Sequence, residues 1–482
     1  MSHAIVWFRR DLRLADNPAL QAALDAGHVP VPVYIHAPDE DAPWAPGAAS
    51  RVWLHRSLQA LDADLRARGS RLVIRRGDSL AELEKLIAET RAEALHWNRL
   101  YEPASIARDT RIKQGLKSRG LVVESHNAAL LVEPWTVQTG QGGPYRVFTP
   151  FWKNARQVLE SVRAAPAPER LPEPPPTLAG LDVDHLGLKP PAGEPAWDAG
   201  FWERWTPGEA GALELLEVFL DGALHGYKRQ RDLPGRVGTS RLSPHLHFGE
   251  ISPRRIVAAV LARRWPAAVQ PDIDHFLSEL GWREFSHHLL FHFPHTANEN
   301  LNPKFEGFRW ATPDAAHLRA WQRGRTGVPI VDAGMRELWH TGWMHNRVRM
   351  VVASFLTKNL RYHWRHGADW FWDTLVDADL ANNTQGWQWT AGTGADAAPY
   401  FRIFSPVSQT QRFDPEGTYL RRWLPELANL PDAALVAPWE HPALMREKAP
   451  DYPRQPVVDL RESREAALAA YSSVRADGPA RR

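Results

Sequence analysis

Short apolar runs and helical patterns alternate through the first 130 residues, and this alternation constrains the fold more than any other feature. Mostly apolar runs typical of buried strands occupy residues 4–8, 31–35, 71–75, 94–97 and 121–125. A leucine pattern at helical spacing ends at Gly69, and residues 79–90 form a second helical pattern led by Asp78 or Ser79. This alternation predicts a parallel, doubly wound sheet, Rossmann-like in layout. No GxGxxG follows the first strand, so an NAD-type fingerprint is absent.

A proline-rich stretch follows this region and precedes a helical one. The proline density of residues 164–197 disfavours both helix and central strand, so we expect an extended connection. Helical spacing dominates later, in 273–293, in 330–360 and less clearly in 369–380. Ser243 and Ser252 each precede a proline, so both are expected to cap helices. The expected organisation is an α/β domain at 1–130, a linker at 131–205 and an all-α domain at 206–482.

The composition excludes several classes of site. The 482 residues include no Cys, which rules out disulfides, thiolate metal sites and cysteine nucleophiles. They include 22 Trp, whose flat faces suit stacking on planar ligands. The net charge of +2 permits a basic face without showing one. We identify no signal peptide and no run of 18 apolar residues, so we expect a cytoplasmic protein with no membrane partner.

Residues 386–406, GWQWTAGTGADAAPYFRIFSP, look like a surface that a ligand binds against. Trp387 and Trp389 are followed by small residues and turn formers, which allow close backbone approach. On helical backbone, a spacing of two would direct these two indoles to nearly opposite sides.

Two further segments combine charge with hydroxyl or aromatic groups. TSRLS at 239–243 offers hydroxyls and an arginine before a helix start, which suits an anion, although the segment taken alone favours an ordinary capped helix. In ELGWREF, the residues Glu279, Trp282 and Arg283 bracket one helix face. The alternative is an amphipathic helix with a local Glu–Arg pair.

Metal binding is not expected at the candidate ligands that we considered. His288, His292 and His295 have helical spacing, but no HExxH accompanies them, so we interpret them as packed or solvent-facing. Asp377 and Asp379 lack an evident third or fourth oxygen ligand.

Five motifs in order resemble one family over nearly the whole chain. They are RRDLRLADNPAL, TSRLSPHLHFGEIS, ELGWREF, TGVPIVDAGMRELWHTGWMHNRVRM and DLANNTQGWQWTAGTGADAAPYFRIFSP. The resemblance is to the DNA photolyase/cryptochrome flavoproteins, and most of all to class I cyclobutane pyrimidine dimer photolyases. It implies an α/β antenna domain, a helical FAD- and DNA-binding domain, deoxyribodipyrimidine photolyase (carbon–carbon lyase) activity, UV-damaged DNA as partner, and a monomer.

The resemblance also implies which residues hold FAD, folded into a U. They are Tyr227, Thr239, Ser240, Arg241, Leu242, Ser243, Phe276, Arg283, Arg349, Asp377, Ala378, Asp379 and Asn383. Residues 239–243, with Tyr227, would hold the phosphates and nearby groups. Arg349 would pair with Asp377, and Asn383 would face flavin N5.

The lesion contacts that the resemblance implies form an overlapping set. They are Glu279, Trp282, Arg283, Asn346, Arg347, Met350, Trp389 and Gln409, with Arg231 near a DNA phosphate. Trp282 and Trp389 would form aromatic walls, each stacking contact contributing roughly 1–3 kcal/mol. Excited reduced flavin would donate the electron that splits the cyclobutane ring and then returns. The implied catalytic residues are Glu279, Asn346, Asn383 and a reducing chain of Trp387, Trp364 and Trp310.

Departures from the family pattern leave alternatives open. Ala104 and Ser105 stand where folate-binding members carry Asn-Glu, which argues against a methenyltetrahydrofolate antenna. A deazaflavin, a flavin or no second chromophore remain open. A cryptochrome photoreceptor is one alternative function, although the helical motifs are followed by only a short tail. A (6-4) photolyase is another, although such relatives place His where this chain has Asn346.

Overall fold

The computed structural model describes residues 2–190, 196–396 and 401–476, and the chain forms two compact units. The first unit comprises Met1–His225, Ser240–Pro294 and Val376–Leu380. The second comprises Gly226–Thr239, His295–Leu375 and Ala381–Arg482. These units divide the chain differently from the expected domains 1–130, 131–205 and 206–482, which stay a prediction. Part of the proline-rich stretch (191–195) and of the 386–406 segment (397–400) lies outside the described residues, as does the end of the tail (477–482).

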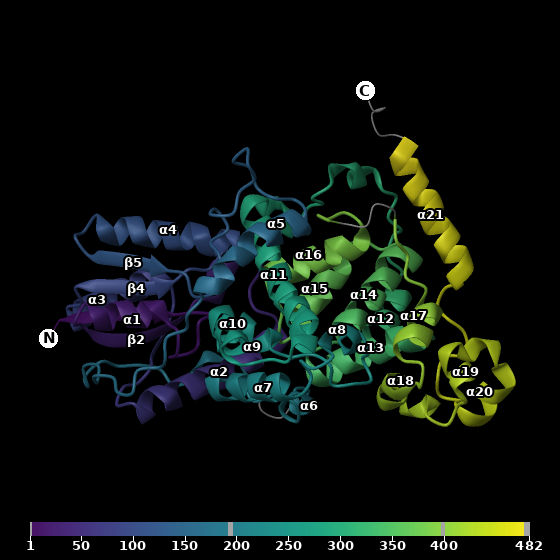
Figure 1. Cartoon of the computed structure of the whole chain (residues 1–482), viewed down its shortest axis with the longest axis horizontal. Helices are drawn as coiled ribbons and strands as arrows, with labels where there is room; N and C mark the ends of the chain where they lie inside the picture. Colours follow the sequence, from purple (N-terminus) through teal and green to yellow (C-terminus); the bar gives the residue numbers. More distant parts are fainter. Residues whose placement is uncertain (1, 191–195, 397–400, 477–482) are drawn as a thin grey trace. The chain divides into compact units, whose positions relative to one another are not determined.

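The first unit contains the predicted doubly wound sheet (Figure 1). Its strands are β1 (His3–Phe8), β2 (Val29–His36), β3 (Val73–Arg76), β4 (Ala94–Asn98) and β5 (Val122–His126). All pairings are parallel, in the order β3-β2-β1-β4-β5. The fold class inferred from the alternating pattern is therefore confirmed, and each predicted strand is present with its bounds shifted by a residue or two.

Helices cover both faces of this sheet. They are α1 (Pro18–Asp25), α2 (Ala48–Ala67), α3 (Ser79–Thr90) and α4 (Pro103–Lys117). Leu83 of α3 and Ile112 of α4 join Trp7 and Trp97 in one buried cluster, which places these two helices on one face. On the other face, Asn98 Oδ1 accepts a hydrogen bond from the backbone N–H of Ala19 at the start of α1. This arrangement buries alternate strand residues on opposite sides.

The remaining helices of the first unit are short except for one. They are α5 (Phe148–Ala155), α6 (Ala199–Trp202), α7 (Glu209–Asp221), α9 (Ser243–His247), α10 (Pro253–Ala262) and α11 (Gln270–His292). Short 3-10 helices occur at Pro38–Asp41, Arg156–Ser161, Val183–Leu186, Ala267–Val269 and Pro294–Ala297, the last at the boundary with the second unit. The long α11 carries the ELGWREF motif.

The second unit is helical in the residues that the structure describes. Its helices are α8 (Tyr227–Gln230), α12 (Ala315–Gln322), α13 (Pro329–Thr341), α14 (Asn346–Ser354), α15 (Trp364–Thr374), α16 (Leu380–Ala391), α17 (Pro406–Phe413), α18 (Thr418–Trp423), α19 (Asp432–Val436), α20 (Pro442–Lys448) and α21 (Leu460–Ala476). A π-helical turn spans Phe355–Asn359, and 3-10 turns occur at Pro303–Gly307, Pro425–Leu427 and Pro438–Glu440.

Two expected helices are broken in ways that matter for the site. The pattern at 330–360 divides at Gly342, whose φ of 66° ends α13, and α14 begins only at Asn346. The pattern at 369–380 ends at Thr374, and residues 375–379 form no helix. Periodicity alone missed both breaks, and both lie next to predicted site residues in buried parts of the chain. No helix among the described residues has the length and apolar character needed to cross a bilayer.

Candidate functional site

The serine-rich segment of the first unit is anchored to an aspartate. α9 begins at Ser243, and its N-cap position is occupied by Leu242, so the prediction that Ser243 caps this helix is wrong. Ser243 instead donates its hydroxyl to Asp377 Oδ2 at 2.6 Å. Arg241 adopts a left-handed backbone conformation with φ of 55°, which turns the segment sharply before the helix. The cap predicted at Ser252 is confirmed, because its hydroxyl accepts from the N–H of Arg255 at 2.9 Å.

Residues 377–379 form a buried acidic turn. Asp377, Ala378 and Asp379 are all buried, and the N–H of Asp379 donates to the carbonyl of Asp377 at 2.7 Å. His287 Nε2 lies 3.4 Å from Asp379 Oδ2. Burial alone would raise the pKa of Asp379, but the opposing charge and hydrogen bond of His287 hold it well below its usual range. Asp379 is therefore an anchored carboxylate that can accept hydrogen bonds from a ligand.

His287 was not singled out in the sequence, although its spacing contains a signal. It lies four residues after Arg283 on α11, and its Nδ1 donates to the Arg283 carbonyl at 3.0 Å. Burial opposes its charged form, but Asp379 outweighs burial and raises the pKa of His287. A histidine one helical turn after a predicted contact residue, in a chain that also contains two nearby aspartates, is a pattern that can indicate a histidine–aspartate ion pair.

Arg283 and its neighbour are fixed by the backbone around the start of the expected linker. Arg283 donates to the carbonyl of Ala129 at 2.7 Å, and Glu284 Oε2 accepts from the N–H of Leu131 at 2.8 Å. Arg283 also lies 3.5 Å from Glu284. Glu284, which sequence reasoning did not select, is fully buried, and burial raises its pKa. These contacts fix the position of α11 against the backbone of residues 129–131.

The face of α11 predicted to meet the lesion is partly occupied by aromatic packing. Trp282 is half-buried and stacks on Phe148 of α5, with ring centroids 3.8 Å apart and planes 9° apart. Glu279 is half-buried and lies 3.9 Å from His275 Nε2, one turn earlier. Phe276 is buried against Phe219 at 4.6 Å. The stack with Phe148 fixes the orientation of the Trp282 indole, and Phe148 was not foreseen.

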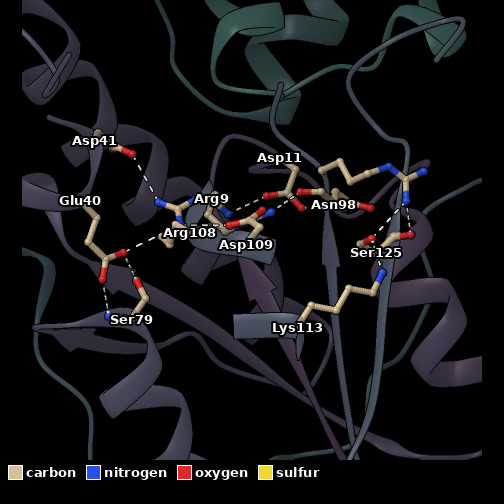
Figure 2. A network of polar contacts seen from close by, with 11 residues as sticks. Arg9, Asp11, Glu40, Asp41, Ser79, Asn98, Arg108, Asp109, Lys113 and Ser125 are labelled. Carbon is tan, nitrogen blue, oxygen red and sulfur yellow. Dashed lines mark hydrogen bonds and ion pairs between the residues drawn. The ribbon is translucent and has the colours of Figure 1, made fainter. Parts of the chain in front are cut away.

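Buried ion pairs fill the edge of the sheet where a doubly wound fold often binds ligands (Figure 2). Arg9 follows β1 and pairs with Asp109 at 3.0 Å, and Arg108 reaches both Asp109 at 3.0 Å and Asp41 at 3.3 Å. Arg9 also donates to the carbonyl of Asn98 at the end of β4, where the strand order changes direction. No predicted site residue lies in this network.

In the second unit, the start of α14 brings three segments together. Asn346 is exposed at the first turn, and Arg347 donates to Asp232 Oδ2 at 2.7 Å. The Arg347 guanidinium also lies over the ring of Phe413 in α17, 4.4 Å from its centroid. α14, α17 and the segment that follows α8 therefore converge at one place.

Basic side chains gather on the segment that contains α8. Lys228, Arg229 and Arg236 are exposed, and Arg231, the residue predicted to lie near a phosphate, is half-buried among them. Only Arg231 was selected from the sequence, although the composition of GYKRQRDLPGR is itself a signal for phosphate binding.

The predicted tryptophan chain lies within the second unit along α15 and α16. Trp387 is buried and packs on Gly367 of α15, and Trp364 lies on the same helix one turn earlier. Trp364 is 1% exposed and donates its indole N–H to Asn300 Oδ1 at 2.9 Å. His363 lies between the next two rings, 5.4 Å from Trp364 and 5.0 Å from Trp310. Trp310 is half-buried, so the series runs from the interior toward solvent.

Other aromatic groups near this series were not predicted. Trp321, fully buried on α12, lies 6.2 Å from Trp387 with edge-to-face geometry. Phe371 lies 5.0 Å from the same indole. The Trp387 ring is therefore enclosed on several sides.

The two tryptophans of GWQWT lie on different sides of α16, as their spacing predicted. Trp387 is buried, whereas Trp389 is half-buried. Asn383, three residues into α16, is half-buried and donates to the carbonyl of Ala368 at 3.0 Å. Met350 and Gln409 are also half-buried.

Several predicted contacts join residues of different units and stay predictions. Arg349 donates to the carbonyl of Met344 at 2.8 Å, and its expected pairing with Asp377 is one of them. The roles given to Tyr227, which is buried, and to Thr239 and Ser240, both half-buried, are also predictions. Of the histidines considered as metal ligands, His288 and His292 hydrogen-bond the carbonyl of Pro134 and His295 is exposed, as the packed or solvent-facing reading expected.

The first unit alone allows a test of whether FAD fits. The Nδ1 atom of His247, in the short helix α9, is buried without a hydrogen-bond partner among the described residues. The hydroxyl segment 240–243 suits phosphate oxygens, and the buried carboxylates of Asp377 and Asp379 suit ligand hydroxyl or N–H donors. These groups match the mixture of anionic, hydroxyl and ring N–H groups on a flavin dinucleotide.

Comparison with known proteins agrees with this chemistry. Residues 4–175 match the family model for DNA photolyase, and residues 276–473 match the model for the FAD binding domain of DNA photolyase. The chain is 48% identical to a deoxyribodipyrimidine photo-lyase of Agrobacterium fabrum, covering 98% of both proteins. It is 40% identical to cryptochrome-1 of Arabidopsis thaliana, covering 96% of this chain and 69% of that protein.

A solved structure extends the likeness to three dimensions. A class III photolyase from Agrobacterium tumefaciens superposes with a TM-score of 0.92 at 46% identity, covering 99% of this chain and 98% of that one. The chain therefore belongs to the DNA photolyase/cryptochrome family. The predicted family, the FAD cofactor and the enzyme class of deoxyribodipyrimidine photolyase are confirmed. The finer likeness to class I members stays a prediction.

Proposed function

We propose that the protein repairs cyclobutane pyrimidine dimers in UV-damaged DNA and that light drives the reaction. When bound, reduced FAD that absorbs blue light would supply the one-electron chemistry that splits the ring of a flipped-out dimer. The family match and the FAD-binding domain support the cofactor and the class of reaction. The choice of lesion depends on residues of this chain.

The single observation that carries the lesion assignment is Asn346. It is exposed at the first residue of α14, with Met350 one turn later on the same side. A carboxamide donates and accepts hydrogen bonds but has no proton to transfer near neutral pH. Repair of a cyclobutane dimer needs a group that holds the base edges but no acid catalyst. The neutral amide of Asn346 can fill this role.

The first unit supplies further proposed lesion contacts. The stacked Trp282–Phe148 pair presents a rigid aromatic group that can pack against an extrahelical base, which is cheaper to flip when a lesion weakens its stacking. Glu279, half-buried on the same helix, can accept hydrogen bonds from base edges. Asp379, kept ionised by His287, can hold a ring N–H of the cofactor.

The second unit supplies the proposed electron entry path and the DNA backbone contacts. Trp387, Trp364 and Trp310, with His363 between the last two, would pass electrons inward from solvent. Arg231 and the exposed basic residues around α8 would contact phosphates, and that binding should weaken as salt rises. We further propose that the protein acts as a monomer in the cytoplasm. A second, antenna chromophore stays a possibility without an assigned identity.

Defined oligonucleotides test the proposal. Two strands of equal sequence, one with a single cyclobutane dimer and one with a single (6-4) product, are incubated with reduced FAD-loaded protein in blue light and in darkness. Chromatography then measures the repaired strand. We expect light-dependent repair of the cyclobutane strand alone. Repair of the (6-4) strand alone would contradict the role of Asn346, and repair of neither would favour the cryptochrome function, which the 40% identity to cryptochrome-1 supports.

A further inference from the structure

A cluster of two histidines and a glutamate lies on one face of the sheet, at its β5 edge. β5 is the outer strand, and His96 of β4 is the register partner of Glu124 of β5. His126, two residues after Glu124, projects to the same face because strand side chains alternate. This is the only such group of potential metal ligands among the residues that the structure describes. The sequence analysis did not consider it, because the ligands come from two separate strands.

The three nearest ligand atoms are spaced as a single metal ion requires. His96 Nδ1 lies 3.4 Å from His126 Nε2 and 3.8 Å from Glu124 Oε2, and the last two atoms are 4.0 Å apart. In the plane of the three atoms, the point equidistant from them lies about 2.2 Å from each. Zinc binds histidine nitrogen at roughly 2.0–2.1 Å and carboxylate oxygen at roughly 2.0–2.2 Å. Only small side-chain adjustments would be needed.

The environment of His96 is difficult to explain by packing alone. Its side chain is 4% exposed, yet its Nδ1 faces two other potential ligands and its Nε2 has no hydrogen-bond partner among the described residues. Buried polar atoms are almost always hydrogen-bonded, so the unpaired Nε2 of the buried His96 calls for an explanation.

The nearby basic side chains of Lys113 and Arg99 bind Ser125 and not the three potential metal ligands. Lys113 of α4 donates to the Ser125 hydroxyl at 2.9 Å (Figure 2), and Arg99 also donates to this residue. Ser125 lies between Glu124 and His126 on β5, so its side chain projects to the opposite face. Glu124 is 54% exposed, which leaves access from solvent on the ligand side.

We propose that His96, Glu124 and His126 bind one divalent transition-metal ion, for which zinc is the best match. Two neutral imidazoles and one carboxylate leave a fourth position for water, the arrangement common to three-ligand zinc sites. The ion would clamp the edge strand β5 to β4 and stabilise the sheet of the first unit. None of these ligands belongs to the set proposed for FAD or DNA, so the site adds to the repair function without depending on it.

Zinc binding by untagged, flavin-loaded protein tests the proposal. After treatment with a chelator, the protein is titrated with zinc in competition with a chromogenic chelator, alongside Glu124→Gln and His126→Gln. Both positions are partly exposed, so these variants should fold, and the flavin absorbance checks that they do. Glu93→Gln, an exposed glutamate before β4, and His366→Gln, an exposed histidine of the second unit, are matched controls.

We expect one tight zinc equivalent in the wild type and in both controls, and at least about tenfold weaker binding in Glu124→Gln and His126→Gln. Zinc should also raise the thermal midpoint of the wild type, because a ligand that binds only the folded state stabilises it. X-ray absorption should show two imidazole ligands. Binding that is absent in the wild type, or equally tight in all five proteins, would overturn the proposal.

Discussion

Replacing Gly367 by alanine should destabilise the second unit and disturb the tryptophan series. A Cβ at this position would lie 2.0, 2.4 and 2.5 Å from three ring atoms of Trp387. Carbon atoms in contact prefer about 3.5–4.0 Å, so the indole would have to move by more than about 1 Å. Trp321 and Phe371 enclose the same ring, so it has little room to retreat.

The magnitude follows from two opposing effects. Alanine in a helix interior is favoured over glycine by about 0.5–1 kcal/mol. Overpacking a rigid, buried site costs about 1–3 kcal/mol, and the enclosed indole places this site near the upper value. We therefore expect a net loss of about 2 kcal/mol in the free energy of unfolding.

Gly386→Ala provides the matched control. Gly386 lies in α16 beside Trp387, is exposed, and a Cβ there would meet nothing within 4 Å. That variant should be about 0.5–1 kcal/mol more stable than the wild type. Urea unfolding followed by circular dichroism measures both, and flash photolysis measures how fast the flavin is photoreduced. If Gly367→Ala unfolds at or above the midpoint of Gly386→Ala, Trp387 does not pack against Gly367 as described.

Three further predictions address the electron path, the lesion wall and the response to pH. Trp364→Phe should abolish photoreduction of the flavin yet leave repair by chemically reduced enzyme intact; loss of both activities would contradict its role. Trp389→Ala should weaken binding of dimer-containing DNA by about 1–3 kcal/mol, measured by gel shift, while flavin absorbance shows that FAD stays bound. Trp339→Ala, at an exposed tryptophan, is the control and should change neither DNA binding nor FAD binding. Burial lowers the pKa of His288 to about 4, so the unfolded chain binds the extra proton first as pH falls from about 6.5 to 4. The wild type should therefore lose up to about 3 kcal/mol of stability over that window. The thermal midpoint of His288→Gln should fall less over the same window. If the thermal midpoints of both proteins fall equally with pH, protonation of His288 does not cause the loss.

The fold of the first unit was predictable because its signals are local. Each strand is a short, mostly apolar run, and some breaks between elements carry a cap or a glycine, such as Asp78 before α3 or Gly69 after α2. The breaks at Gly342 and after Thr374 were not predictable in this way. Apolar spacing continues through both, and only tertiary packing decides that the chain leaves the helix there.

The candidate site residues were selected from the motifs and not from periodicity, and their roles stay predictions. Ordered motifs identified Asp379 and Trp282, whereas their partners His287 and Phe148 come from packing between distant segments. The failure of Ser243 to cap α9 has the same origin, because its hydroxyl is used by Asp377, 134 residues away. A local pattern carries no information on such pairings.

The central claim is tested most directly by the recovery of thymine absorbance near 260 nm in UV-treated oligothymidine. The purified, FAD-loaded protein is reduced, mixed with the damaged strand and followed in blue light and in darkness. The account predicts recovery in blue light and none in darkness. No recovery in light, with FAD present and photoreducible, would contradict dimer repair as the function of this protein.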